Sequence, residues 1–371
     1  MTERHSEILV IGGGVIGLSI AWHLSRSSHS ITVMDSSEPG QASQAAAGML
    51  APLAEASAPG PFLDLALASL RHYPEFVEGV RDASGLALEI CGPGMLRVAR
   101  TSEEVAALDR SLAWQTSLGL PLERLSGEEM RRLEPAASQS ILAATHSPQE
   151  RHIEPRLLIA ALSAACRRRG VEQISGKVIG LESEAERVVA VRTDTAQFTC
   201  KTLVLAGGAW SDLLGQWLGV DIPVKPLRGQ ILALGPSAKP LLQHTLYTHG
   251  AYLVPRRDGR IVAGATEESV GLDTSTTACG LAALRSSAEA LVPALADQPL
   301  QSAWTGLRPL SADALPLMGR VPGWDNVHVA TGHGRNGILL APITGNLMAS
   351  SILTDTSLPN AFDPSRFGGT L

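Results

Sequence analysis

The apolar positions at the start of the chain form a short continuous run that leads directly into a glycine-rich turn. Residues 8–11 are all apolar, which is typical of a strand buried on both faces of a parallel sheet. After the turn, apolar residues at helical spacing predict a helix, namely Val15, Leu18, Ile20, Ala21 and Leu24. Residues 31–34 predict a second strand that ends at Asp35. Strand, helix and strand in this order predict one half of a nucleotide-binding fold.

Further helices and strands alternate along the rest of the chain. Helical periodicity predicts helices over residues 62–81, 102–118 and 155–169, and the last of these begins with Pro155, which is favoured in a first helical turn. Short runs rich in apolar and β-branched residues predict strands at residues 96–99, 145–146, 178–181, 188–193 and 203–206. The last strand enters another glycine turn, and residues 332–353 predict a final glycine turn and helix.

This order of elements predicts a protein of two domains, α/β in the first and α+β overall. At 371 residues the chain is long for a single hydrophobic core. We expect a discontinuous, Rossmann-like nucleotide-binding domain formed by residues 1–84, 146–222 and 319–371. Residues 85–145 and 223–318 are expected to form a second, mainly antiparallel domain that binds substrate.

Composition and charge argue against several kinds of partner. The chain is 44% hydrophobic and carries a net charge of −6, so no basic field is available for nucleic acid or anionic lipid. The basic run at residues 167–169 precedes Gly170, as is usual at the end of a helix. Residues 8–25 lack charge but contain four glycines and a histidine, so we expect neither a membrane span nor a signal peptide. A cytoplasmic protein is expected.

The four cysteines are spaced too widely for a zinc or redox motif. Cys91, Cys166, Cys200 and Cys279 include no pair separated by two residues. We therefore expect free, buried thiols in a reducing compartment, and no metal site.

The motif Gly12-x-Gly14-x-x-Gly17 carries the strongest chemical signal. Gly12 permits a tight turn, Gly14 lets a pyrophosphate approach the backbone, and Gly17 lets helix and strand pack closely. Phosphates are favoured at the N-terminus of the following helix by its N–H groups and dipole. Asp35 lies 21 residues after Gly14, where its carboxylate can accept hydrogen bonds from a ribose. A glycine motif alone also occurs for structural reasons, but the complete unit predicts an adenine dinucleotide site.

Beyond this motif, nearly the whole chain resembles the flavin-dependent amino-acid oxidase family, which includes D-amino-acid oxidase, sarcosine oxidase and glycine oxidase. The resemblance rests on GGGVIG (12–17), AAAGML (45–50), HIEPRLL (152–158), VLAGGAWS (204–211), PLRGQIL (226–232), AYLVPRRDGRIVAGAT (251–266), GLRPLSADALPLMG (306–319) and GHGRNGILLAPITG (332–345). AAAGML and RNGILLAP are most similar to the glycine-oxidase branch, which is associated with making the thiazole of thiamine. The resemblance implies FAD rather than NAD, bound at a site between two domains.

The resemblance also assigns residues to FAD along its whole length. It places one group at the pyrophosphate and ribose, Val178 at the adenine, and residues 42–49 along the ribityl chain and isoalloxazine edge. Residues 333–339 would surround the flavin C2=O and N1, where a helix N-terminus stabilises negative charge. The full set is Gly12, Gly14, Val15, Ile16, Gly17, Asp35, Ser36, Ala42, Ser43, Ala47, Gly48, Met49, Val178, Gly207, Trp210, His333, Gly334, Arg335, Asn336, Gly337, Ile338 and Leu339.

For the substrate, the resemblance points to Tyr252, Arg308 and Arg335. A guanidinium holds a carboxylate in a bidentate pair, so we expect Arg308, placed in a short turn between strands, to bind the substrate carboxylate with help from the Tyr252 hydroxyl. Arg335 is expected to hold the amine through its backbone carbonyl. Plainer roles stay open at this point: an ion pair for Arg308, strand packing for Tyr252 and a structural side chain for Arg335.

Two further residues near these segments allow alternative interpretations. His333 could act as a base, but we expect a helix-start residue that lies against the flavin ring. Glu267 follows the expected strand end at residues 264–266, where the glycine-oxidase pattern has an apolar residue. It could bias the pocket towards an amine or line the solvent entrance.

The reaction implied by the resemblance is hydride transfer from the substrate Cα to flavin N5. Water would hydrolyse the resulting imine to a 2-oxo acid and ammonia, and O2 would regenerate the flavin and yield hydrogen peroxide. The sequence does not rank glycine, sarcosine, D-alanine and D-proline as substrates. A dehydrogenase for D-amino acids or secondary amines that passes electrons to a quinone, and a flavin-binding scaffold without turnover, are the alternatives. Relatives suggest a homo-oligomer, either tetramer or dimer.

The mode of flavin attachment follows from the position of the cysteines. Sarcosine oxidases attach their flavin to a cysteine near the segment that corresponds to residues 306–319. No cysteine follows Cys279 in this chain, so we expect non-covalent FAD.

Overall fold

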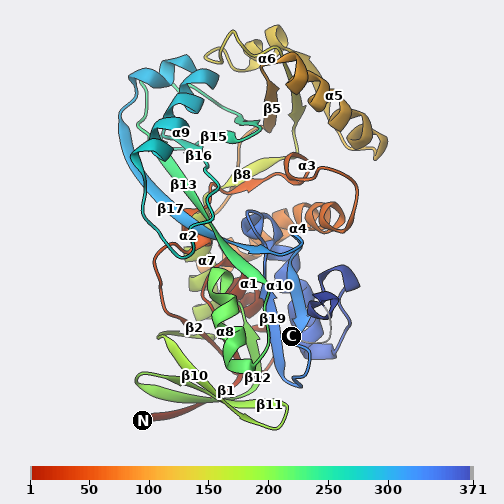
Figure 1. Ribbon diagram of the computed structural model, residues 1–371, viewed down its shortest axis with the longest axis vertical. Coiled ribbons are helices and arrows are strands. Elements are labelled where there is room, and N and C mark those ends of the chain that lie inside the picture. The colour runs from red at the N-terminus through yellow and green to blue at the C-terminus, as the bar shows by residue number, and fades with distance from the viewer. Residues whose placement is uncertain (1, 368–371) are drawn as a thin grey trace.

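The protein consists of two large sheets at opposite ends of an elongated molecule, with a small sheet between them (Figure 1). The computed structural model describes residues 2–367. Helices and strands are mixed in both halves, which confirms the predicted α/β and α+β architecture. The exact residues at which the two domains divide stay a prediction.

The lower sheet of Figure 1 is built around the predicted nucleotide-binding unit. Its strands are β1 (Thr2–Ile11), β2 (Ile31–Asp35), β9 (Glu172–Ser175), β10 (Val178–Glu184), β11 (Arg187–Thr193), β12 (Ala196–Leu205), β18 (Leu317–Arg320) and β19 (Val327–Thr331). Strands β19, β12, β1, β2 and β9 are parallel neighbours in that order. Strands β10 and β11 extend the sheet in antiparallel fashion beside β12.

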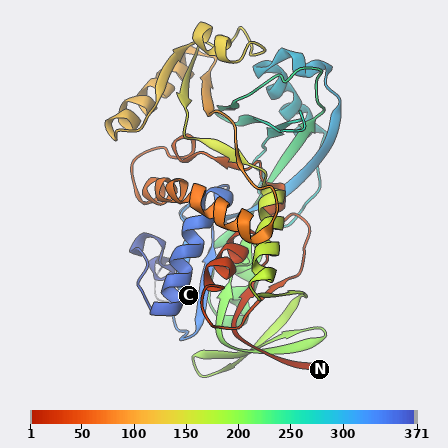
Figure 2. The ribbon, with the colours of Figure 1, turned by 180° about the vertical axis from the view of Figure 1, so that it is seen from behind.

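Successive side chains of β1 point to opposite faces of this sheet and enter two different cores. Ile8 and Val10 pack with a group of four helices, whereas Leu9 and Ile11 pack towards a single helix on the other face. The four helices, which Figure 2 shows from behind, are α1 (Val15–Leu24), α4 (Pro61–Ser84), α7 (Pro155–Arg168) and α10 (Gly337–Thr354); the single helix is α8 (Ser211–Leu218). Burial on both faces explains why residues 8–11 are continuously apolar.

Helix α10 is long and apolar enough to cross a membrane, and it is the single helix with this property within residues 2–367. It packs against α1 and α4, and 56% of it is buried inside the protein. Pro342 within the helix has no N–H to donate to the Ile338 carbonyl. The Tyr73 hydroxyl donates to that carbonyl instead, at 2.7 Å, and Ser69 donates to the carbonyl of Leu339 at 2.6 Å. These bonds join α4 to the start of α10.

The upper sheet is mainly antiparallel. Its strands, in spatial order, are β17 (Leu300–Ser311), β13 (Val224–Leu234), β16 (Ile261–Gly264), β15 (Ala251–Pro255), β14 (Thr245–Thr248), β5 (Met95–Ala99), β7 (Ala143–Ser147) and β6 (Glu123–Ser126). Strands β14 and β5 are parallel neighbours. Helices α5 (Ser102–Ser117), α6 (Gly127–Leu133) and α9 (Ala278–Leu291) pack on this sheet. The long pair β13 and β17 reaches from it towards the lower half (Figure 1).

Short elements connect the two halves near the middle of the molecule. The small sheet contains β3 (Met49–Leu50), β8 (Arg151–Ile153) and β4 (Ile90–Cys91), and two four-residue helices flank β3, α2 (Ala42–Ala45) and α3 (Pro52–Glu55). The described residues also form four 3-10 helices: η1 (Gly208–Trp210), η2 (Pro293–Asp297), η3 (Asn360–Phe362) and η4 (Pro364–Phe367). Residues 42–55, which include β3 and both short helices, therefore lie between the two large sheets.

The expectation that all four thiols are buried is wrong. All four cysteines are free, and Cys166 and Cys200 are buried, but Cys91 is half-buried and Cys279 is exposed. Burial raises the pKa of Cys166 to about 12 and that of Cys200 to about 11. Cys279 lies in the first turn of α9 on its solvent side, a position that residue spacing in the sequence cannot reveal.

Candidate active site

A cavity of about 870 Å3 lies between the two large sheets and is lined by residues of both. Gly12 and Asp35 line it from the lower half, and Tyr252 and Arg308 line it from the upper half. A cavity of this size is at the upper end of the range for small-molecule sites. It therefore suits an extended cofactor together with a small substrate.

The glycine turn closes the lower end of the cavity. Gly12 has φ of +114°, and a Cβ there would overlap the Ala206 carbonyl. A Cβ at Gly17 would overlap the Gly12 carbonyl, so this glycine lets α1 pack tightly against the turn. Gly14 differs from both, because a Cβ there would meet only the Ser43 hydroxyl, at 3.2 Å. The backbone at Gly14 thus faces open space at the helix N-terminus, where an anion is favoured.

Asp35 lies at the end of β2 and lines the cavity next to this turn. One of its carboxylate oxygens accepts a hydrogen bond from the Gly13 N–H, and the other accepts from the Ser37 N–H and from the Gln41 side chain, the last at 2.8 Å. These bonds tie the loop after β2 to the glycine turn. The acid expected to bind a ribose therefore also fixes the two loops that would surround that ribose.

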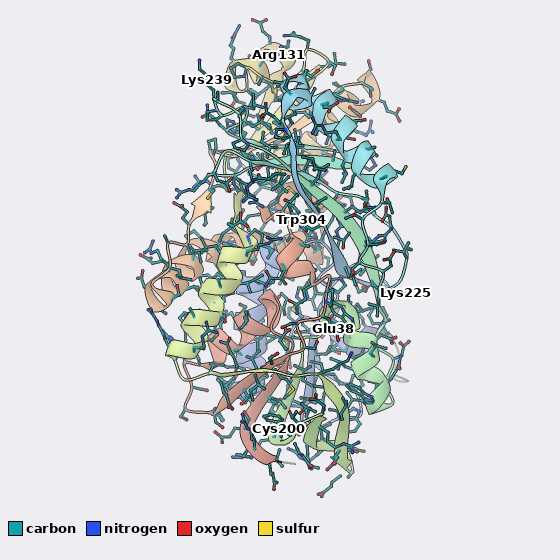
Figure 3. The ribbon with its side chains drawn as sticks, turned by 90° about the vertical axis from the view of Figure 1, so that its left-hand side faces the viewer. Glu38, Arg131, Cys200, Lys225, Lys239 and Trp304 are labelled. Atoms are coloured by element: carbon teal, nitrogen blue, oxygen red, sulfur yellow. The ribbon has the colours of Figure 1, made fainter. Side chains whose placement is uncertain are left out.

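Residues 42–49 form one wall of the cavity and are held from both halves of the molecule. Trp304, labelled at mid-height in Figure 3, donates from Nε1 to the Ala45 carbonyl at 2.9 Å. Arg256 donates to the Ala47 carbonyl at 2.8 Å. Gly48 has φ of +82°, and a Cβ there would overlap the Ile153 carbonyl. Hydrogen bonds to its main-chain carbonyls therefore fix this wall, whose residues at positions 42 and 45–48 are all alanine or glycine.

Arg308 lies within strand β17, so its expected position in a turn is wrong. A proline is unusual inside a sheet, because Pro309 has no N–H to donate to a neighbouring strand. In the structure Pro309 lies opposite Pro226 of β13, and a facing pair of prolines is tolerated where N–H groups point away from the partner strand. The guanidinium occupies the space above Gly229 and donates to the Thr266 carbonyl at 3.0 Å. Within residues 2–367 no carboxylate pairs with Arg308.

Tyr252 lies on β15, and its ring packs over Gly264 of β16, where a side chain would overlap the phenol. Burial raises the pKa of the Tyr252 phenol, and the positive charge of Arg308 acts in the opposite direction. The phenol therefore stays protonated at neutral pH and can donate a hydrogen bond. Arg308 and Tyr252 both line the cavity, as two donors on neighbouring parts of its wall.

Arg335 forms a bridge between two carboxylates at the same end of the cavity. Its Nε donates to Glu55 and its Nη1 donates to Glu267 at 3.0 Å. The Glu55 side chain is 6% exposed, whereas that of Glu267 is 51% exposed. Burial raises the pKa of Glu55, and the charge of Arg335 opposes this rise. The Arg335 side chain is thus occupied by acids of the protein itself.

His333 is buried at the turn that precedes α10 and lines the cavity. Its Nε2 and the Thr344 hydroxyl are hydrogen-bonded at 3.0 Å. Burial lowers the pKa of His333 to about 3, so the ring is neutral at physiological pH. A ring with so low a pKa is a poor proton acceptor, which favours the helix-start interpretation over that of a base.

Two of the predicted cofactor residues do not line the cavity. Gly17 packs against the Gly12 backbone, and Leu339 is buried in the core beside α4. Their role in binding the cofactor, like that of the others, stays a prediction. The residues that do line the cavity are Gly12, Gly14, Val15, Ile16, Asp35, Ser36, Ala42, Ser43, Ala47, Gly48, Met49, Val178, Gly207, Trp210, His333, Gly334, Arg335, Asn336, Gly337 and Ile338.

The cavity also contains residues that the sequence did not single out. Tyr247 faces Tyr252 across the β14–β15 hairpin, and burial raises its pKa to about 12. Trp217 lines the cavity from α8, seven residues after Trp210. A spacing of seven is two helical turns, so this signal was present in the sequence. Glu55 had no such signal, because its partner Arg335 is 280 residues away.

Helix α3, which carries Glu55, is anchored by a buried acid. One oxygen of Glu150 accepts hydrogen bonds from the N–H groups of Leu53, at 2.6 Å, and Ala54, at 3.2 Å. Its other oxygen and the Ser147 hydroxyl are both buried and have no partner within residues 2–367. Burial raises the pKa of Glu150 to about 7, although the two N–H groups oppose this. The acid therefore holds its proton in the native state at pH values where an unfolded chain would lose it.

Replacing Glu150 with Gln is expected to flatten the dependence of stability on pH. Between pH 4.5 and 7 the unfolded chain ionises Glu150 while the native protein keeps it protonated, so stability present below pH 4.5 is lost as the pH rises. The amide stays neutral, and its NH2 group can donate to Ser147. As the pH rises from 4.5 to 8, the free energy of unfolding of Glu150→Gln should increase by about 3 kcal/mol relative to that of the original protein. Urea unfolding at several pH values measures this gain.

The exposed Glu103 on α5 supplies a control for this experiment. Glu103→Gln removes the same charge from a solvated position and should leave the pH profile of unfolding unchanged. Parallel profiles for Glu150→Gln and the original protein would show that Glu150 has the same pKa in the native and the unfolded states, contrary to the expectation.

The fold and the cavity first define a class: a dinucleotide-binding protein with room for a small carboxylate beside the cofactor. The profile of the family described as DAO, FAD dependent oxidoreductase, matches residues 7–351. A glycine oxidase of Bacillus licheniformis is 36% identical over 357 residues, which cover 95% of this chain and 94% of that protein. The crystal structure of glycine oxidase from Geobacillus kaustophilus has a TM-score of 0.91 at 31% identity and covers 99% of both chains.

A bifunctional protein ThiO/ThiG of Synechocystis sp. is 37% identical over 374 residues. The match covers 98% of this chain and 54% of that protein, so the chain spans about half of that relative's length. The chain belongs to the DAO family of FAD-dependent oxidoreductases. It is an enzyme whose cofactor is FAD.

The residues at the lower end of the cavity fit that cofactor. The open backbone at Gly14, the N-terminus of α1 and the carboxylate of Asp35 offer sites for a pyrophosphate and a ribose. At the upper end, Gly337 begins α10 and lines the cavity, so a second helix N-terminus faces the region where a flavin ring would lie. These two helix ends would hold the anionic and the electron-accepting parts of FAD respectively.

Proposed function

We propose that the enzyme oxidises glycine and other small amines, such as sarcosine and D-alanine, to the 2-oxo acid and hydrogen peroxide, with release of ammonia, or of methylamine from sarcosine. The observation that carries this proposal is Arg308, a guanidinium on the cavity wall without a carboxylate partner within residues 2–367. Similarity over nearly the whole chain to a glycine oxidase and to a ThiO/ThiG protein supports it. On the same ground we propose that the product imine supplies the thiazole of thiamine.

In this proposal Arg308 and Tyr252 bind the substrate carboxylate. The guanidinium can form two parallel hydrogen bonds, which fix the orientation of the carboxylate as well as its position. The Tyr252 phenol adds a third donor because it remains protonated. The backbone carbonyl of Arg335 would accept a hydrogen bond from the substrate amine, while the guanidinium of this residue donates to Glu55 and Glu267.

Bound FAD supplies the acceptor for the hydride of the substrate Cα–H bond. The protein contributes orientation, because a carboxylate held on one side and an amine held on the other leave one direction for that bond. His333 is neutral and hydrogen-bonded to Thr344. Its ring therefore places no positive charge near the substrate amine. The substrate reacts as the free amine, and water then converts the imine into the 2-oxo acid and ammonia.

FAD is expected to leave the protein on denaturation, because residues 306–319 contain no cysteine that could bind it covalently. Precipitation with trichloroacetic acid should place all of the yellow colour in the supernatant. Absorbance of both fractions measures the distribution, and a yellow pellet after washing would contradict the expectation.

Turnover with O2 tests the proposed activity. Glycine, sarcosine and D-alanine should each cause O2 uptake, with one ammonia or methylamine and one hydrogen peroxide formed per O2 consumed. An electrode and coupled assays measure these ratios. Reduction of a dye without O2 uptake would instead identify a dehydrogenase, and FAD that no amine reduces would identify a binding protein without turnover.

The assembly belongs to the same proposal. We expect a homo-oligomer, either a tetramer or a dimer, on the strength of the family resemblance, and light scattering after gel filtration measures its mass. A cytoplasmic location stays a prediction from the sequence.

A further inference from the structure

The charged side chains at the upper end of the cavity differ in whether they are paired with opposite charges. Two arginines line it, and only one of them is paired with acids within residues 2–367. Arg335 pairs with Glu55 and with Glu267, whereas Arg308 bonds to a carbonyl. In the described part of the chain, one guanidinium therefore has no acidic partner, whereas the other already donates to two acids.

The paired group contains more acidic than basic side chains. Two carboxylates share the single guanidinium of Arg335, so the three side chains sum to −1 when both acids are ionised. Glu55 is buried beneath Arg335, and Glu267 is the half-exposed member of the group. The surplus charge is thus presented mainly by Glu267 to a ligand entering from solvent.

Glu267 lies directly beside the expected carboxylate site. The preceding residue, Thr266, accepts the hydrogen bond from Arg308 Nη1 at 3.0 Å, and both residues line the cavity. The charges of Arg308 and Arg335 both act to lower the pKa of Glu55, because the three side chains lie close together at this end of the cavity. A substituent on the amine of a substrate held at Arg308 would extend past this acidic wall.

We propose that Glu267 selects substrates by the charge of the amine substituent. Amines with one carboxylate and a neutral or cationic substituent are accepted, and amines with a second carboxylate are rejected. A second carboxylate would meet the charge of Glu267, and at Arg335 it would meet a guanidinium whose Nε and Nη1 already donate to acids of the protein. This inference deepens the proposed function and rests on it for the place of the first carboxylate.

Two unreactive anions test the selection without turnover. Methoxyacetate carries one carboxylate, and diglycolate adds a second carboxylate at the other end of the same ether. Each is titrated into the FAD-loaded enzyme, and the change in flavin absorbance gives its Kd. The ratio of the diglycolate Kd to the methoxyacetate Kd should fall about fivefold in Glu267→Gln, as expected for the loss of one half-exposed repulsion. High salt should lower the ratio in the original enzyme towards that of the variant.

A control with the same change in net charge separates this local effect from a general one. Glu75 is exposed on α4 and does not line the cavity, so Glu75→Gln should keep the original ratio. A ratio in Glu267→Gln within twofold of the original, or an equal fall in Glu75→Gln, would overturn the proposal.

Three substrates extend the test to catalysis. N-(2-aminoethyl)glycine, N-ethylglycine and iminodiacetate carry a cationic, a neutral and an anionic substituent, and kcat/KM should decrease in that order. Glu267→Gln should reduce the spread between the first and the last about fivefold or more. Oxidation of all three in an unchanged ratio would overturn the charge selection while leaving the proposed function intact. A shifted Kd ratio without oxidation of any amine would support the selection and contradict the proposed function.

Discussion

Replacing Arg308 with Ala is expected to raise the KM for glycine by about two orders of magnitude while FAD stays bound. Removing one partner of a hydrogen-bonded charge pair costs about 2–5 kcal/mol, and about 3 kcal/mol corresponds to a factor of about 150. The residues expected to bind FAD approach the cavity mainly from other elements, so the flavin content should not change. Steady-state kinetics and the ratio of flavin to protein absorbance measure the two quantities.

Two further variants make the result specific. Arg308→Lys should recover part of the loss, because a lysine restores the charge but not the bidentate geometry. Arg320→Ala removes a half-exposed arginine that pairs with Asp355 outside the cavity, and it should leave the KM unchanged. An unchanged KM in Arg308→Ala would remove this residue from the substrate site.

Alanine at Gly14 and at Gly17 should separate cofactor binding from folding. A Cβ at Gly14 meets only the Ser43 hydroxyl, at 3.2 Å, so the apoprotein should keep its Tm. The same Cβ projects where a pyrophosphate must approach the backbone, so the Kd for FAD should rise about a hundredfold or more. Titration of apoprotein with FAD, followed by flavin fluorescence, measures the Kd.

Gly17→Ala should show the opposite order of effects. Its Cβ would overlap the Gly12 carbonyl, which forces α1 away from the turn and should cost about 1–3 kcal/mol of stability even without FAD. Thermal unfolding of both apoproteins compares them directly. Equal Tm losses for Gly14→Ala and Gly17→Ala would show that the two glycines do not have distinct roles.

The nucleotide-binding unit was predictable because its signals are local. A buried parallel strand requires a continuous apolar run, and the turn after it requires glycine where φ is positive, as at Gly12. The ends of α5 and α7 were predicted to within about two residues for the same reason. Helix periodicity and glycine turns depend on neighbours in the chain, so the sequence displays them.

The chemistry at the upper end of the cavity was only partly predictable. The GLRP motif predicts a turn at Arg308, whereas its position in a strand depends on the distant strand β13, in which Leu227 lies opposite Arg308 and Pro226 lies opposite Pro309. The bridge from Arg335 to Glu55 joins residues 280 apart, and the bond to Glu267 joins residues 68 apart. Such pairs leave no periodic pattern, so only the folded chain reveals that, among the residues described, Arg335 has acidic partners and Arg308 has none.

Anaerobic mixing of the yellow protein with glycine, sarcosine and D-alanine, followed by admission of air, tests the central claim most directly. Flavin absorbance near 450 nm (roughly where oxidised flavin absorbs) reports the outcome. Glycine and sarcosine are expected to bleach the colour, and air is expected to restore it with formation of hydrogen peroxide. A colour that no amine bleaches, in protein that retains its FAD, would contradict the assignment of this cavity to amine oxidation.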